Sequence, residues 1–223
     1  STTITGCTFE NCTSGTLGGG IYINSSAPTT ITGCTFENCE SVGNGGAINI
    51  TTPAIVTLEG CEMEGCTSGQ DGGALYLNAR GTATVTRCTI SDCSANSQGG
   101  GIFLAPSSEV TLDDCTISGC YAYSQGGGIY HSSTQTTTTF KNGEISGCTS
   151  QLGSAVMLMG SGALVIMDSD VKDCISGGGT TANSGGAIRT YGNVSASLYL
   201  TRVNFTGNKA KRNKNWDNTL AKD

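Results

Sequence analysis

Twelve cysteines are the residues most able to do chemistry in this 223-residue chain, because a thiol can form a disulfide, bind a metal or attack an electrophile. Ten of them form five pairs that recur with a fixed period of about 27 residues. The first cysteine column consists of Cys7, Cys34, Cys61, Cys88 and Cys115. The second cysteine column consists of Cys12, Cys39, Cys66, Cys93, Cys120, Cys148 and Cys174. A fixed period of this length predicts a stacked array in which equivalent residues lie above one another.

The number of cysteines in each column limits how they can pair. Both numbers are odd, so pairing only within a column would leave one free thiol in each. Pairing within a repeat, as Cys7 with Cys12, leaves two cysteines over. Those two, Cys148 and Cys174, would lie on adjacent repeats at a separation that a disulfide spans. We therefore favour six disulfides, which need a sharp turn between the paired cysteines, over a mixed or partly reduced ladder.

The cysteines also indicate the compartment and the absence of a metal centre. Many cysteines without zinc-finger spacing are typical of an oxidising compartment, so we expect the protein to be extracellular or on the cell surface. Two cysteines separated by four residues do not resemble a tetrahedral zinc site. We predict neither a metal nor any other cofactor.

Carboxylates could support catalysis, because polysaccharide hydrolysis uses two acidic side chains that converge on one face. An acidic column at the repeat spacing, Glu10, Glu37 and Glu64, is predicted to be a solvated ladder. The acidic cluster that does not repeat, with the basic residues near it, consists of Asp168, Asp170, Lys172, Asp173 and Arg202. The single histidine, His131, replaces an apolar residue and is predicted to be a tolerated edge residue. We assign no catalytic residue and keep a carbohydrate-active enzyme as the alternative.

Short β-strands must position these residues, because no segment has helical periodicity and glycine interrupts every repeat. Two strand patterns are recognised in each repeat, the second of them directly after paired glycines. One predicted inward column is Ile4, Ile31, Leu58, Val85, Leu112, Phe140, Ile166 and Leu200, and another is Phe9, Phe36, Met63, Ile90, Ile117, Ile145, Val171 and Phe205. The pattern predicts an all-β parallel β-helix of about seven to eight 27-residue coils over residues 1–208. A polar tail over residues 209–223 carries Lys209, Lys211, Arg212 and Lys214.

Two motifs resemble those of a known family. Gly45-Gly-Ala-Ile48 and Phe205-Thr-Gly-Asn208 are similar to the Gly-Gly-Ala-Ile and Phe-x-x-Asn repeats of chlamydial-type polymorphic outer-membrane proteins. In Phe9-Glu-Asn-Cys12 a cysteine replaces the final asparagine. The resemblance spans nearly the whole chain and implies a right-handed parallel β-helix of the pectin-lyase-like superfold. It also implies a role as a surface adhesin.

Outward positions suggest where ligands and glycans could bind. The middle residue of the second strand is predicted to face outward, and its aromatic members are Tyr22, Tyr76, Phe103 and Tyr130. Exposed aromatic rings at this spacing could stack on sugars or on another rod, although strands also favour aromatic residues for packing alone. Five sequons are candidate N-glycosylation sites: Asn11, Asn24, Asn49, Asn193 and Asn204.

Composition narrows the partners. The net charge of −6 argues against nucleic acid, because phosphate binding needs a basic surface. No apolar run approaches the ~20 residues of a membrane-spanning helix, so we expect no direct membrane insertion. We expect self-association or contact with another extracellular protein of the same assembly, with glycans as further ligands. The predicted function is a secreted or cell-surface structural or adhesive rod, for example a filament subunit, with a glycan-binding module or enzyme as the alternative.

Overall fold

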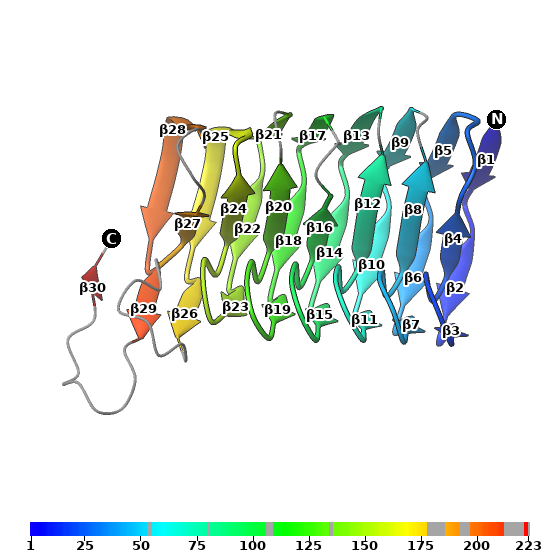
Figure 1. Cartoon of the computed structure of the whole chain (residues 1–223), viewed down its shortest axis with the longest axis horizontal. Helices are drawn as coiled ribbons and strands as arrows, with labels where there is room; N and C mark the ends of the chain where they lie inside the picture. The colour runs from blue at the N-terminus through cyan, green and yellow to red at the C-terminus, as the bar shows by residue number, and fades with distance from the viewer. Residues whose placement is uncertain are drawn as a thin grey trace.

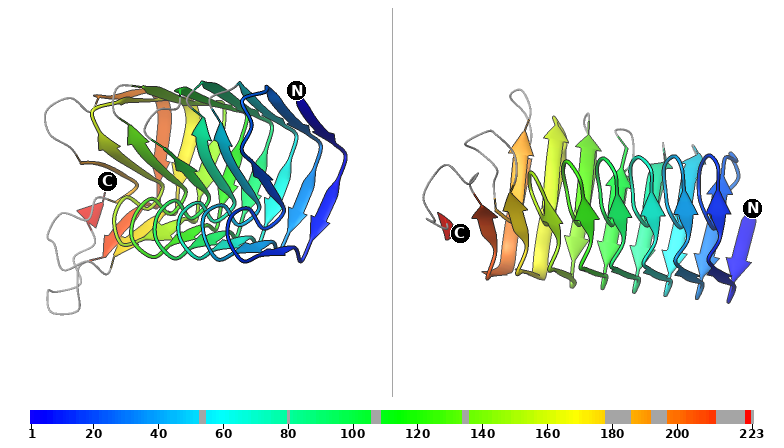
Figure 2. Two further views of the ribbon diagram at one scale, coloured as in Figure 1. Left: turned by 45° about the vertical axis from the view of Figure 1, so that its right-hand side comes forward. Right: turned by 90° about the horizontal axis from the view of Figure 1, so that it is seen from below.

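The chain winds as a parallel β-helix in which one circuit, here called a coil, stacks on the next (Figure 1). The computed structural model describes residues 1–52, 55–79, 81–105, 109–133, 136–177, 186–191, 197–211 and 221–222. Every strand over these residues pairs in parallel with its equivalent in the adjacent coil, except for one antiparallel contact at the C-terminal end. The views in Figure 2 show the coils stacked along a single axis from the N-terminal to the C-terminal end. The predicted fold class is therefore confirmed.

The first large sheet has 14 strands and contains two ladders that meet at a corner. Strands of the first type precede the first cysteine column: β1 (Thr2–Thr5), β5 (Thr29–Thr32), β9 (Val56–Glu59), β13 (Thr82–Thr86), β17 (Glu109–Asp113) and β21 (Thr137–Lys141). Strands of the second type follow that column: β2 (Thr8–Glu10), β6 (Thr35–Glu37), β10 (Glu62–Glu64), β14 (Thr89–Ser91), β18 (Thr116–Ser118) and β22 (Glu144–Ser146). In the last two coils one longer strand spans both positions, namely β25 (Ala163–Lys172) and β28 (Ser197–Thr206).

Two further sheets complete each coil. Strands of the third type follow the second cysteine column: β3 (Thr13–Ser14), β7 (Glu40–Ser41), β11 (Thr67–Ser68), β15 (Ser94–Ala95), β19 (Tyr121–Ala122), β23 (Thr149–Ser150), β26 (Ile175–Gly177) and β29 (Lys209–Lys211), with β30 (Ala221–Lys222) antiparallel to β29. Strands of the fourth type are β4 (Ile21–Ile23), β8 (Ile48–Thr52), β12 (Leu75–Ala79), β16 (Ile102–Leu104), β20 (Ile129–Ser133), β24 (Val156–Gly160) and β27 (Ile188–Tyr191). A complete coil therefore has up to four strands where the sequence indicated two. Strands of two or three residues are too short to show an alternating pattern.

Residues with a left-handed backbone conformation turn the chain at the two corners that flank the second-type strand of each coil. The corner before the first cysteine column, or its equivalent, is formed by Gly6, Gly33, Gly60, Arg87, Asp114, Asn142, Asp168 and Arg202, with φ between 50° and 60°. The corner before the second cysteine column, or its equivalent, is formed by Asn11, Asn38, Gly65, Asp92, Gly119, Gly147, Asp173 and Gly207. Glycine, asparagine and aspartate adopt this conformation at the least cost. Asp168 and Asp173, two members of the acidic cluster noted in the sequence, therefore lie at corner positions that recur along the rod.

The length of a coil is nearly constant along the rod. The inward column that begins at Ile4 advances by equal steps as far as Leu112. The next two members, Phe140 and Ile166, depart from this step by no more than one residue each, whereas Leu200 follows after a clearly longer stretch of chain. About six coils of regular length are thus followed by a longer one. This number of regular coils is slightly smaller than the seven to eight predicted.

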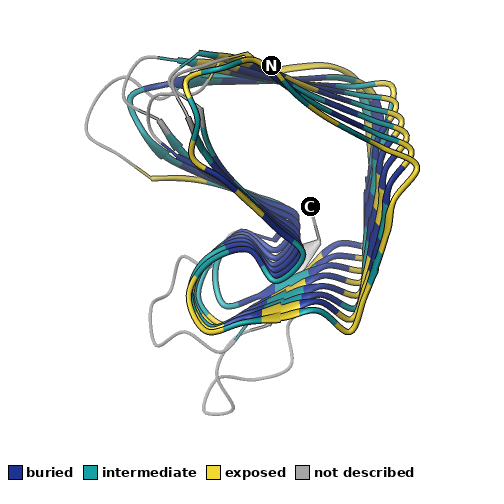
Figure 3. Ribbon diagram, turned by 90° about the vertical axis from the view of Figure 1, so that its right-hand side faces the viewer, coloured by how far each residue is buried: buried dark blue, intermediate teal, exposed yellow. Residues whose placement is uncertain are grey.

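The sheets surround a common interior, as the view along the axis shows (Figure 3), and buried apolar side chains form the core there. Both predicted inward columns are buried through the middle of the rod, from Ile31 to Ile166 and from Phe36 to Val171. Members at the two ends are less covered: Ile4 is half-buried and Leu200 is 45% exposed. Burial by the neighbouring coil is the reason for this difference, because each coil covers the next.

The C-terminal boundary of the stack lies slightly beyond the predicted one. Residues 209–211, which the sequence assigned to the tail, form β29 and pair with β26. Arg212 and Lys214 lie outside the described residues. No described segment is a helix of the length and apolarity needed to cross a membrane.

Candidate functional site

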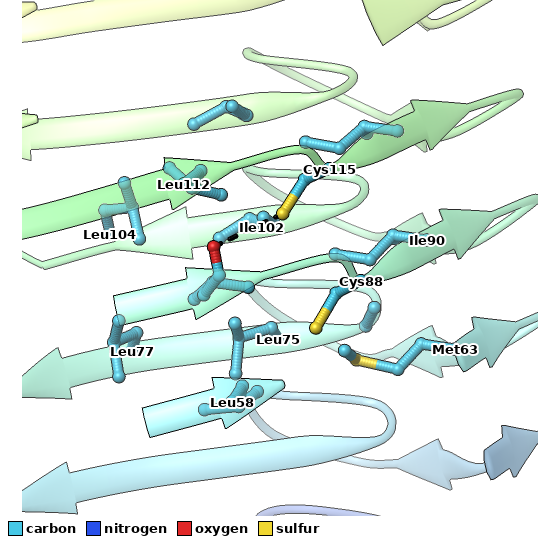
Figure 4. Close-up of a cluster of buried hydrophobic side chains, with 14 of the residues drawn as sticks. Leu58, Met63, Leu75, Leu77, Cys88, Ile90, Ile102, Leu104, Leu112 and Cys115 are labelled. Carbon is cyan, nitrogen blue, oxygen red and sulfur yellow. Dashed lines mark hydrogen bonds between the residues drawn. The ribbon is translucent and has the colours of Figure 1, made fainter. Parts of the chain in front are cut away.

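The two cysteine columns lie at the ends of the second-type strands, with the sulfur atoms directed into the core. Figure 4 shows Cys88 and Cys115 pointing into the cluster of buried apolar side chains. All twelve cysteines are free thiols. Ten are buried, whereas Cys7 is exposed and Cys12 is half-buried. Burial raises the pKa of Cys39 to about 12, so this thiol is protonated at neutral pH.

Each cysteine stacks directly on its equivalent in the next coil. The carbonyl oxygen of Cys7 accepts a hydrogen bond of 2.9 Å from the backbone N–H of Thr35, the residue after Cys34. The corresponding bond recurs for every cysteine up to Cys174. Axial neighbours also approach through sulfur: the backbone N–H of Cys61 donates to Cys88 Sγ at 3.4 Å. The nearest partner of a cysteine is therefore the one above or below it.

Pairing within a coil, which the sequence favoured, is wrong in this structure. Strand β6 lies between Cys34 and Cys39, and its central residue, Phe36, points into the core between them. Five extended residues span up to about 17 Å, whereas the Cα atoms of a disulfide lie about 4.4–6.8 Å apart. Cys148 and Cys174, which the sequence predicted to be linked, lie on adjacent coils, where the backbone N–H of Ile175 donates a hydrogen bond of 2.9 Å to the carbonyl oxygen of Cys148. Whether any disulfide forms stays a prediction.

Acidic residues along the rod pair with a cation from the following coil. Four ion pairs are present among the described residues: Glu59 with Arg87, Asp113 with Lys141 at 3.0 Å, Glu144 with Lys172 at 2.6 Å, and Asp168 with Arg202. Hydrogen bonds from Lys172 and Arg202 lower the pKa values of Glu144 and Asp168, respectively. The Asn142 amide and then Lys141 lower the pKa of Asp113. These carboxylates are therefore held in the charged form.

A polar hollow of about 350 Å³ opens over the corner of the last coils. Among the residues that line it are Asn142, Glu144, Asp168, Asp170, Arg202 and Asn204. Asp170 Oδ1 accepts a hydrogen bond of 2.8 Å from Asn204 Nδ2. The structure thus brings together Asp168, Asp170 and Arg202 from the predicted cluster, and it places Asp173 at the corner before Cys174. The acidic column Glu10, Glu37 and Glu64 lies elsewhere and is exposed in register, as predicted.

Comparison with known proteins agrees with this geometry. A family model described as a right-handed β-helix region matches residues 1–121 and 73–216. The chain belongs to the right-handed β-helix family. Neither the curated proteins nor the solved structures contain a match to it. The handedness of the coil follows from this membership.

The outward aromatic residues of this right-handed β-helix are less exposed than predicted. The rings of Tyr76, Phe103 and Tyr130 stack at centroid separations of 5.0 Å and 5.1 Å. Tyr22 is 48% exposed and Tyr76 is half-buried, but Phe103 and Tyr130 are only 8% and 3% exposed. The cause is a second small core, in which these rings pack with Ala105 and Met157. The predicted four-residue binding surface is thus reduced to Tyr22 and part of Tyr76.

The sequons of the right-handed β-helix also differ in accessibility. Asn11, Asn24 and Asn204 are exposed. Asn49 is fully buried, and its side-chain amide donates a hydrogen bond of 3.0 Å to the carbonyl oxygen of Asn44. The folded chain therefore does not offer Asn49 for glycosylation, which corrects that prediction. Asn193 lies outside the described residues.

His131 is a buried polar residue and not the edge residue that the sequence indicated. It is fully buried in β20, and its Nε2 lies 3.2 Å from the hydroxyl oxygen of Thr138. Its Nδ1 has no hydrogen-bond partner. Burial lowers the pKa of His131 to about 4, so the ring is neutral at pH 7. The available signal was a second polar residue at an inward position, because Thr138 lies in register between Val110 and Leu164.

Sequence reasoning also missed the ion pairs between coils. Glu59 and Arg87, like Glu144 and Lys172, are 28 residues apart. These two pairs could have been found by searching for opposite charges 28 residues apart, which is one residue more than the 27-residue repeat. Searching only at the exact period compares residues in the same register and does not reveal this diagonal contact.

Proposed function

We propose that this right-handed β-helix is a structural or adhesive rod of a secreted or cell-surface protein and does not act as an enzyme. The observation that carries the proposal is the pairing of carboxylates with cations of the next coil. These pairs fasten successive coils and hold the carboxylates charged. A general acid needs the opposite change, a raised pKa that keeps its proton near neutral pH.

The extracellular location is supported by the cysteines and by the exposed sequons. Twelve cysteines in two axial columns suit an oxidising compartment, where thiols can be converted to disulfides. Asn11, Asn24 and Asn204 are open to glycosylation there. The resemblance of the repeat to polymorphic outer-membrane proteins supports an adhesive role. The partners would be a second rod, another extracellular protein or a glycan, with Tyr22 as the exposed aromatic contact.

A carbohydrate-active enzyme is the second candidate, and the polar hollow favours it. Asp170 lines the hollow beside Asp168 and is bound by the Asn204 amide instead of a cation. A long polysaccharide could lie along the corner of the rod, as the regular spacing of coils allows. In that case Asp170 would be the residue to act on the sugar.

Turnover on polysaccharides separates the two candidates. The folded chain is incubated with a panel of acidic and neutral polysaccharides, and new reducing ends and unsaturated products are measured. The rod proposal predicts no product above that of a heat-denatured sample. Product that disappears in Asp170→Asn, but persists in a control that replaces the exposed Glu62 by glutamine, would establish the enzyme instead.

A further inference from the structure

We propose that both cysteine columns close as axial disulfides, each joining a cysteine to its equivalent in an adjacent coil, so that one free thiol remains in each column. The proposal takes its oxidant from the extracellular location proposed above. The bond pattern itself can be tested in a redox buffer of defined composition. It replaces the pairing within a coil, which the extended second-type strands exclude.

The second cysteine column is continuous. From Cys39 to Cys174, the residue after each member donates a backbone hydrogen bond to the carbonyl oxygen of the equivalent cysteine in the preceding coil. The same thiols lie 3.4–3.9 Å from the carbonyl oxygen of the residue three positions before that cysteine, so each sulfur is held against the preceding coil. Adjacent strands lie about 4.8 Å apart, which is within the range of Cα separations of about 4.4–6.8 Å that disulfides adopt. The cysteines lie between strands, at corners. The backbone there can adjust so that the Cβ atoms approach the separation of about 3.8 Å that a bridge requires.

The first cysteine column divides into two pairs and a remainder. The backbone N–H of Cys7 points at Cys34 Sγ, 3.5 Å away, and Cys34 Sγ lies 3.8 Å from the carbonyl oxygen of Ile4, in the same coil as Cys7. The N–H of Cys61 bears the same relation to Cys88 Sγ at 3.4 Å. We therefore assign one bridge to each of these pairs. Cys115 keeps the free thiol of this column.

The chemistry of closure is thiol–disulfide exchange with a low-molecular-weight disulfide such as oxidised glutathione. One cysteine thiolate attacks the oxidant, forms a mixed disulfide and releases one glutathione thiolate. The neighbouring thiolate then attacks the protein sulfur of the mixed disulfide, which forms the bridge and releases the second glutathione. The two cysteine protons end on the two glutathione thiols, so two cysteines are oxidised and one oxidant is reduced. Because ten of the cysteines are buried in the folded chain, the exchange accompanies the packing of the coils.

The position of the free thiol in the second column is limited by counting. Seven members form three bridges and leave one thiol, which can only be the first, third, fifth or seventh member. These are Cys12, Cys66, Cys120 and Cys174. When the free thiolate attacks the neighbouring bridge, a new bridge forms and another cysteine, two coils away, becomes the free thiol. This exchange causes no net change in redox state. When one cysteine of this column is replaced, the number of free thiols that remain therefore depends on the position of that cysteine in the column.

Two matched variants test the number of free thiols that axial pairing predicts. Cys93 and Cys120 are both fully buried and are axial neighbours. Cys120→Ser divides the second column into four and two cysteines, which close completely. Cys93→Ser divides it into three and three, and each part keeps one thiol. The first column adds one further thiol to the wild type and to each variant.

Free thiols are counted by alkylation and mass measurement after the chains have refolded in a glutathione redox buffer. Axial pairing predicts two thiols in the wild type, one in Cys120→Ser and three in Cys93→Ser. Pairing within coils predicts none in the wild type and one in each variant, and a fully reduced ladder predicts twelve and then eleven. Either of these patterns overturns the proposal. If a variant does not fold, peptide mapping of the oxidised wild type decides: a Cys61–Cys88 link supports axial pairing and a Cys61–Cys66 link contradicts it. A negative result in this test would not affect the proposed extracellular location, which cell fractionation tests separately.

Discussion

Lys172 Nζ donates a hydrogen bond of 2.6 Å to Glu144 Oε2, although 28 residues separate the two in the chain. The contact joins β25 to β22 diagonally, because Lys172 pairs in register with Ser146 and not with Glu144. A diagonal contact also joins Glu59 to Arg87, because the register partner of Glu59 is Thr86, the residue before Arg87. The ion pairs in the described part of the chain therefore run along the axis of the rod, from one coil to the next.

Reversing the charges of Glu144 and Lys172 should reveal how strongly this ion pair stabilises the rod. Glu144→Lys places two cations side by side and should lower Tm, whereas the double variant Glu144→Lys/Lys172→Glu should recover most of the loss. Thermal unfolding of the four proteins in a double-mutant cycle measures the coupling. The coupling should shrink in about 1 M salt, where the screening length falls to about 3 Å. Additive effects of the two changes at low salt would contradict the contact.

Inward and outward positions of one strand should differ sharply in their tolerance of charge. Val85 is 1% exposed and pairs with Leu58 and Leu112, whereas the adjacent Thr84 is exposed. Val85→Asp should cost about 3–5 kcal/mol because it buries an unpaired carboxylate. Thr84→Asp should change the free energy of unfolding by about 0.5 kcal/mol or less. Urea unfolding measures both, and similar values would show that the register is wrong.

Two glycines should tolerate alanine to different degrees. A Cβ atom on Gly73 would overlap the carbonyl oxygen of Gly100 in the next coil, where neither backbone can retreat without opening the stack. Gly73→Ala should therefore cost roughly 4 kcal/mol or more. Gly60 has a φ of +58° but open space around it, so Gly60→Ala should cost only the strain of about 1–2 kcal/mol. Equal losses in chemical denaturation would contradict the close approach of the coils.

His131 should make the rod sensitive to acid. Its pKa is about 4 in the folded chain against an ordinary value of 6.5, so the unfolded chain takes up the proton first as the pH falls. Stability should decline between about pH 6.5 and about pH 4, by about 3 kcal/mol in all from this residue. His131→Leu should remove this part of the decline, because leucine matches its axial neighbours Leu104 and Leu158. Urea unfolding of both proteins at about pH 7.5 and about pH 4.5 gives the difference; an equal decline in both would refute the assignment.

The fold could be predicted because the apolar inward positions that produce it recur in every repeat of the sequence. Each inward position of the coil appears many times, so the columns that contain Leu58 and Met63 stand out against variable neighbours. The cysteine pairing and the aromatic surface could not be predicted in the same way. Pairing depends on how far β6 extends between Cys34 and Cys39, and the burial of Tyr130 depends on Met157 and Ala105, which approach it only when the coils stack. Contacts between coils at other than the repeat spacing are invisible in an alignment of repeats.

The central claim is that this right-handed β-helix works outside the cell, and fractionation of the source cells tests it most directly. Culture medium, proteins labelled on intact cells by a membrane-impermeant reagent, and interior proteins are separated, and this chain is measured in each by mass spectrometry. Free thiols are alkylated before lysis so that the redox state is preserved. The account predicts that the chain is found in the medium or in the surface-labelled fraction, with most cysteines protected from alkylation. A chain confined to the interior, with all twelve cysteines alkylated, would contradict it.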